Sequence, residues 1–149
     1  MNSGNILQEK MATVYRRRHH LFVHASSMTT DGVWILTEPV FKLDAGSADA
    51  EIGSAIRLSL QHSHANVQHP TNWGGLLTPL LTQAGVKSWG RFIEGASCVI
   101  AVLKGETLSV IPTENLGSKG GFKHQLGASI SLNSEATTDI GAAVRKLLG

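Results

Sequence analysis

Two ten-residue segments of this chain carry the same kinds of residue at the same offsets. Residues 51–60 read EIGSAIRLSL and residues 139–148 read DIGAAVRKLL, so an acid, Ile, Gly, Ala, a β-branched residue, Arg and Leu recur in register. A glycine inside a helix costs about 1 kcal/mol relative to alanine, so its repeated use predicts two helices that pack closely against a sheet or each other. The alternative is that two amphipathic helices share these residues by chance. Either interpretation describes architecture and no reaction.

Strand-like patterns occupy much of the remaining chain. They run from Thr13 to Val23 and from Val33 to Leu43, and the turn dipeptide Asp31–Gly32 between them predicts a hairpin. Pro39 interrupts the second run, which favours an edge position, a bulge or a break there. Three further strands are predicted, over Ser97–Leu103, Thr107–Pro112 and Phe122–Leu132.

Helical patterns separate these strands. Helices are predicted over Ser47–Gln61, over a short middle segment closed by Gly85, and over Ser134–Leu148, the last capped by Asn133 or Ser134. The sequence therefore predicts an α+β fold, in which a mainly antiparallel sheet of about five strands packs with two or three helices.

The composition indicates one globular domain over residues 1–149, with 42% hydrophobic and 16% charged residues. Residues 1–12 show neither clear periodicity nor turn chemistry, so a loose N-terminal arm or a short helix is expected there. No apolar run approaches the ~18 residues that span a bilayer, and the N-terminus is too polar for a signal peptide. The single cysteine, Cys98, forms no internal disulfide. We therefore predict a cytoplasmic protein.

Candidate catalytic residues are few. His62, His64 and His69 suggest a metal-dependent enzyme, but no acid lies among them and the second ligand pair typical of zinc sites is missing. Cys98 lies in a predicted core strand, and no Gly-x-Ser-x-Gly motif occurs. The glycine-rich residues 117–121 lack the spacing of a phosphate-binding loop and lead into a strand. We expect no enzymatic activity, no bound metal and no cofactor.

One dense basic run, Arg16 to Arg18 followed by two histidines, suggests a different function. With Tyr15 and Phe22 beside it, this strand could bind a nucleic acid. A period of two places alternate side chains on opposite faces, and short basic runs are also typical of solvated edge strands. The formal net charge of only +2 does not by itself imply a polyanionic partner. A small nucleic-acid-binding module that uses Arg16–Arg18 is therefore the alternative function.

Several short motifs, in this order, resemble the small immunity proteins of bacterial contact-dependent growth inhibition systems. The resemblance spans roughly residues 33–149 and none of its motifs is catalytic. They are Pro39-Val40-Phe41-Lys42-Leu43, Ile52-Gly53-x-Ala55-Ile56-Arg57, His69-Pro70-x-x-Trp73, Lys87-Ser88-Trp89, Gly120-Gly121-Phe122 and Ile140-Gly141-x-Ala143-Val144-Arg145.

This resemblance implies an inhibitor that binds the C-terminal toxin domain delivered by a neighbouring cell, commonly a nuclease, in a 1:1 complex that blocks the active site. Many nuclease inhibitors are acidic, whereas this chain is near neutral, so the contact is predicted at local clusters. A toxin surface of mixed charge would instead meet His62, His64, His69 and Trp73. The predicted toxin-binding residues are Asp44, Asp49, Glu51, His69, Trp73, Glu106 and Glu114.

Overall fold

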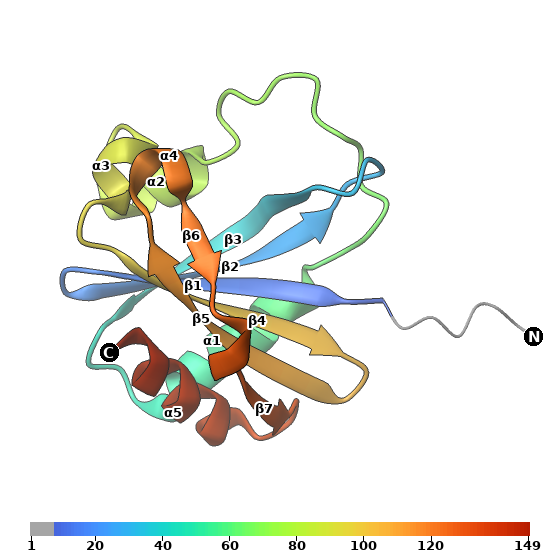
Figure 1. Cartoon of the computed structure of the whole chain (residues 1–149), viewed down its shortest axis with the longest axis vertical. Helices are drawn as coiled ribbons and strands as arrows, with labels where there is room; N and C mark the ends of the chain where they lie inside the picture. Colours follow the sequence, from blue (N-terminus) through green and yellow to red (C-terminus); the bar gives the residue numbers. More distant parts are fainter. Residues whose placement is uncertain (1–7) are drawn as a thin grey trace, which may run out of the picture.

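The computed structural model describes residues 8–149, which form one twisted sheet covered by helices on both faces (Figure 1). The strand order is β3-β2-β1-β4-β5-β6, and β7 also pairs with β5. All of these pairs are antiparallel. The α+β class is confirmed, with seven strands in place of about five. The strands are β1 (Lys10–Arg17), β2 (His20–Met28), β3 (Trp34–Asp44), β4 (Ser97–Lys104), β5 (Thr107–Asn115), β6 (Phe122–His124) and β7 (Ile130–Asn133).

The first predicted strand is in fact a hairpin of two strands. Arg17 of β1 lies opposite His20 of β2, so the chain reverses at Arg18 and His19. Arg18 has φ 57°, a left-handed conformation that non-glycine residues rarely adopt. No Gly, Asn, Asp or Pro marks this turn, and the sequence pattern therefore missed it. Strand β1 begins at Lys10, so the last three residues of the predicted arm belong to the sheet, whereas residues 1–7 lie outside the described part.

The last predicted strand is also two strands. β6 and β7 are separated by a short 3-10 turn, Leu126–Ala128, and both pair with β5, whose nine residues are long enough to hold them. At the opposite edge, β3 is an edge strand, and its register against β2 shifts between His24 and Ala25, where the residues around Pro39 bulge. The prediction for Pro39 is thus confirmed.

The helices are α1 (Asp49–Gln61), α2 (Thr78–Ala84), α3 (Trp89–Ile93), the single turn α4 (Gly117–Gly120) and α5 (Thr137–Leu148). Gly85 ends α2 with φ 72°, as predicted. The predicted cap of the last helix is wrong, because α5 begins after Ala136 and has no side-chain cap. The Asn133 side chain instead accepts a hydrogen bond from the Glu135 amide at 2.8 Å, which stabilises a turn before the helix.

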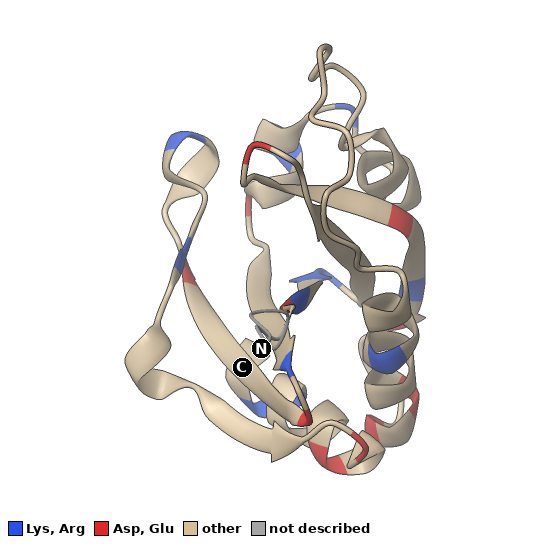
Figure 2. Cartoon of the chain, turned by 90° about the vertical axis from the view of Figure 1, so that its right-hand side faces the viewer, with Lys and Arg blue, Asp and Glu red and all other residues tan. Residues whose placement is uncertain are grey.

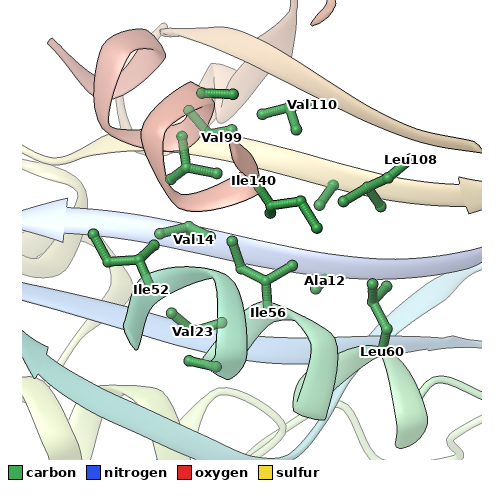
Figure 3. Packing of buried hydrophobic residues seen from close by; sticks show 14 of the residues in the cluster. Ala12, Val14, Val23, Ile52, Ile56, Leu60, Val99, Leu108, Val110 and Ile140 are labelled. Carbon is green, nitrogen blue, oxygen red and sulfur yellow. The ribbon is translucent and has the colours of Figure 1, made fainter. Parts of the chain in front are cut away.

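The first face of the sheet is covered by α1 and α5 (Figure 1). Aliphatic side chains from both helices meet those of the central strands, and no aromatic ring lies among the fully buried residues of this cluster. Figure 3 shows Ile52 and Ile56 of α1 pointing toward Val14 and Val23 of the sheet. The buried residues are Ala12, Val14, Leu21, Val23, Ile52, Ala55, Ile56, Leu60, Val99, Ala101, Leu108, Val110, Ile140, Ala143 and Val144.

The repeated glycines lie where these two helices touch each other. A Cβ on Gly53 would lie 1.9 Å from the carbonyl oxygen of Thr137, and a Cβ on Gly141 would lie 1.8 Å from that of Asp49. Each glycine thus meets the residue that stands four positions before the other glycine. The two halves of the repeat exchange the same contact, as in an isologous interface. The predicted close packing of one helix against its counterpart is confirmed.

The repeated arginines follow the same exchange, which the sequence pattern alone did not explain. Arg57 donates to the Thr137 hydroxyl at 2.8 Å, and Arg145 donates to the Asp49 carboxylate at 2.8 Å. Arg145 also donates to the carbonyls of Ala45 and Ser47 in the loop before α1. The glycines allow the two helices to approach closely, and each arginine forms a hydrogen bond from its own helix to the first turn of the other.

The second face of the sheet is covered by α2 and α3, and its core is aromatic, with Phe122 of β6 packed against it. The Phe92 ring of α3 lies edge-on to Tyr15 at 5.1 Å and to Phe22 at 5.9 Å, and stacks on Trp89 at 5.6 Å between centroids. The buried residues are Met11, Tyr15, Phe22, Val40, Leu80, Phe92, Ala96, Cys98, Ile100 and Ile111.

Candidate functional site

Three reactive groups lie inside the second core. Burial raises the pKa of the Cys98 thiol to about 12, and burial also raises the pKa of Tyr15. Burial lowers the pKa of His24 to about 4, although its Nδ1 bonds the Ala25 carbonyl at 2.7 Å. All three groups are neutral at pH 7 and at most 8% exposed. Their position makes them packing residues of the sheet.

The histidines of the metal hypothesis do not converge. His62 is the C-terminal cap of α1, the His64 amide donates to the Ser27 hydroxyl at 3.0 Å, and His69 lies beside the Thr29 hydroxyl at 2.9 Å. Among residues 8–149, no group of three or more His, Cys, Asp or Glu side chains is placed to hold a metal ion.

The basic run of the alternative function is divided between the two faces of the sheet. Arg16 donates to the Gly149 carbonyl at 2.6 Å, beside the end of α5. Arg17 is 8% exposed and donates to the carbonyls of Phe92 at 3.1 Å and Arg91 at 3.4 Å, at the end of α3. Two of the three guanidinium groups therefore bond carbonyls at the carboxyl ends of helices, where the backbone favours a cation.

Three of the predicted acidic contacts come together before and within the first turn of α1. Asp44 accepts from the Gly46 amide at 2.7 Å, Asp49 accepts from Arg145 at 2.8 Å, and Glu51 accepts from the Ala48 amide at 3.3 Å. Asp44 and Glu51 thus have local partners that shape the loop and the helix start, whereas Asp49 pairs with Arg145 and links α1 to α5.

The other two acids lie apart from this cluster. Glu106 lies in the turn between β4 and β5, and Glu114 lies opposite Lys123 near the far end of β5. Figure 2 shows acidic residues distributed over several parts of the molecule and interspersed with Lys and Arg. The structure therefore does not gather the seven predicted residues on one surface.

His69 and Trp73 form a small cluster in the connection between α1 and α2. Their rings meet edge-to-face at 5.2 Å, and His69 Nε2 lies 3.6 Å from the Asp31 carboxylate in the β2–β3 turn. Val67 forms a bridge to Thr29, which attaches this loop to the same turn. Trp73 remains 50% exposed. An anchored loop thus presents a large aromatic side chain to solvent, an arrangement typical of contact residues in interfaces.

The structure adds a pocket that the sequence pattern did not reveal. A cavity of about 730 Å³ lies between the β1–β2 turn, the end of β3 and the junction of α2 with α3. We call it the basic pocket; its charged and titratable lining residues are Arg17, Arg18, His20, Lys42, Lys87 and Arg91. They come from three separate stretches of sequence. Arg17, Arg18 and His20 belong to the basic run with its two histidines, and no sequence signal joined them to Lys42, Lys87 and Arg91.

Comparison with known structures identifies the fold. A protein of unknown function from Neisseria meningitidis superposes with a TM-score of 0.78 and 14% identity, covering 99% of this chain and 98% of that one. A chain of the "CdiA-CT/CdiI toxin and immunity complex" from Yersinia pseudotuberculosis superposes with a TM-score of 0.78 and 13% identity, covering 97% and 98%. The chain has the fold of a toxin–immunity complex component. No family model and no curated protein matches the sequence.

This match covers almost the whole length of both chains, so the shared fold is that of the whole domain. It agrees with the resemblance that the sequence motifs indicated. In the described residues, 8–149, no helix is both long and apolar enough to cross a membrane.

Proposed function

We propose that this chain is an immunity protein, which binds and neutralises the toxin domain of a contact-dependent growth inhibition system. The observation that carries the proposal is the full-length fold match to a chain of the CdiA-CT/CdiI complex. The sequence motifs point independently to the same class. The protein acts by covering the active site of its partner in a 1:1 complex, without a substrate or a cofactor of its own.

The toxin in this proposal is a nuclease, the activity that such immunity proteins commonly counter, and the protein acts in the cytoplasm where a nuclease meets its substrates. Its contact surface includes Trp73 and His69. The exposed fraction of Trp73, 50%, leaves a large apolar area that a partner can bury. Toxin contact by Asp44, Asp49, Glu51, Glu106 and Glu114 stays a prediction, and the first three already bond within the chain.

The test uses the toxin domain encoded beside this protein. Co-expression is expected to restore growth of cells that produce the toxin, and the purified pair is expected to elute as one complex with the mass of a 1:1 assembly. One equivalent of the protein should abolish degradation of RNA or DNA by the toxin in vitro. Absence of both binding and protection would overturn the proposal.

A control variant tests whether protection of the cells requires the folded protein. Gly141→Val places a branched side chain against the Asp49 backbone, so this variant is expected to lose the fold and with it the protection. Protection by the unfolded variant would show that growth rescue does not depend on the folded protein.

A further inference from the structure

The basic pocket concentrates positive charge well beyond what the near-neutral chain would suggest. It holds five of the thirteen Lys and Arg residues of the chain, together with His20. None of its eleven lining residues is acidic. Like charges placed around one cavity repel each other, so such an arrangement is most stable when an anion occupies the cavity.

Most of this charge has no carboxylate partner within residues 8–149. Arg17 bonds only backbone carbonyls, which fix its position and leave its positive charge unpaired. Among the described residues, Arg18, Lys42 and Lys87 form no ion pair. The charge of the pocket is therefore available to a ligand.

Two acids lie near the pocket, and neither fills it. Asp44 lies opposite His20 in the sheet, but its carboxylate accepts from the Gly46 amide at 2.7 Å. Glu94 lies 3.7 Å from Arg91, and both side chains are 68% exposed, so water screens this pair. Neither residue is among those that line the cavity.

The form of the pocket favours carboxylates of a protein over a nucleic acid. Its aromatic lining residues are Phe22, which is 2% exposed and packs on Phe92, and His20, whose ring lies 6.3 Å from that of Phe22, so the pocket offers no row of exposed rings on which successive bases could stack. The charged residues line a single pocket between the β1–β2 turn, the end of β3 and the junction of α2 with α3. Side chains that project from a loop fit such a shape.

We propose that the basic pocket receives an acidic segment of the partner protein, whose Asp or Glu side chains insert between Arg18, Lys42 and Lys87. The inference rests on the proposed function and specifies the chemistry of the partner at this site. It reverses the charge expected from the sequence, because the protein supplies cations to the contact and the toxin supplies carboxylates.

The experiment measures toxin binding by calorimetry for the double variant Lys42→Glu/Lys87→Glu. Both lysines are exposed, so the fold and the melting temperature are expected to stay as in the wild type. The dissociation constant should rise by about 100-fold, because charge reversal replaces attraction by repulsion at desolvated contacts. The control Lys104→Glu/Lys146→Glu changes the net charge equally outside the pocket and should alter binding by less than about threefold. Equal affinities for both double variants would overturn the inference while leaving the proposed function intact.

If the wild type binds no toxin and the proposed function fails, a second measurement tests the pocket independently of the toxin. The protein is titrated at low salt with a hexaglutamate peptide and with a single-stranded RNA of similar charge. Tighter binding of the peptide, lost in Lys42→Glu/Lys87→Glu, would support the pocket as a carboxylate site. Tighter binding of the RNA, or no binding of the peptide, would overturn it.

Discussion

The two faces of the sheet are built in different ways. On the first face, α1 and α5 are held to each other by two glycines whose backbone neighbours leave no space for a side chain, and the core is aliphatic. On the second face, short helices cover an aromatic core, and the basic pocket, which Phe22 of this core lines, belongs to this side. One face is thus a tight helix pair over an aliphatic core, and the other combines an aromatic core with a pocket of positive charge.

Removal of the central ring of the second face should have the largest effect on stability. Phe92→Ala deletes a fully buried ring that contacts Tyr15, Phe22 and Trp89, and the free energy of unfolding should fall by about 4 kcal/mol. Urea denaturation measures it. Leu126→Ala, at a side chain that is 69% exposed, should change stability by less than about 0.5 kcal/mol. A comparably small loss in Phe92→Ala would mean that the first face alone holds the fold.

A single added methyl group should disrupt the first face almost as strongly. In Gly141→Ala the new Cβ meets the Asp49 backbone, and the separation of α1 from α5 that follows should cost about 3 kcal/mol, more than the helix propensity of alanine returns. Gly127→Ala is the control, because no atom beyond its chain neighbours lies within 4 Å of the added Cβ. Stability equal to the wild type in Gly141→Ala would exclude the close helix contact.

The same contact predicts strong coupling between the two glycines. Gly53→Ala alone should cost a similar amount, but the double variant should cost less than the sum of the two, because the first substitution already moves the helices apart. Additive costs would indicate that the two glycines pack independently and that the repeat has no shared joint.

The pH dependence of stability should depend on the second face, where His24 is buried. Its pKa in the folded protein is about 4, below the ordinary value of 6.5, so the unfolded chain binds the proton first as pH falls. Stability is therefore full above pH 6.5 and declines toward pH 4, by about 2 kcal/mol at pH 5. Urea denaturation at pH 7 and pH 5 measures this loss.

His24→Phe keeps a ring at the position and removes the titrating group. The variant should lose stability less steeply than the wild type between pH 7 and pH 5, since only its other ionisable groups respond. An unchanged slope would assign the acid sensitivity to groups outside the second core.

The elements that the sequence predicted correctly are those with strong local signals. The glycines and apolar residues of the repeat marked α1 and α5, and Gly85 marked the end of α2. The turn at Arg18 was missed because its conformation is imposed by the pairing of β1 with β2 and not by a turn residue. Local sequence signals therefore predicted α1, α2 and α5, whereas the number of strands depended on tertiary contacts.

The candidate site was harder to predict for the same reason. His69 and Trp73 are four residues apart, and the sequence correctly placed them in one exposed connection. The basic pocket joins Arg18, Lys42 and Lys87, which only the folded sheet brings together. Acidic residues that looked available in the sequence, such as Asp49, have partners far along the chain. A cluster of acids in the sequence does not show which of them pair with a cation far along the chain.

The smallest effect on stability, and a clear effect on binding, is expected at Trp73. Trp73→Ala should change the free energy of unfolding by less than about 0.5 kcal/mol, because its ring is half exposed and contacts His69 at the surface. Affinity for the toxin domain should fall about tenfold, as for a tryptophan that a partner buries. Leu58→Ala on α1 is the matched control, with an exposed fraction of 47% on a helix of the first face. A larger loss of toxin binding in Leu58→Ala than in Trp73→Ala would place the partner on α1, on the first face of the sheet, and not on the connection that carries Trp73.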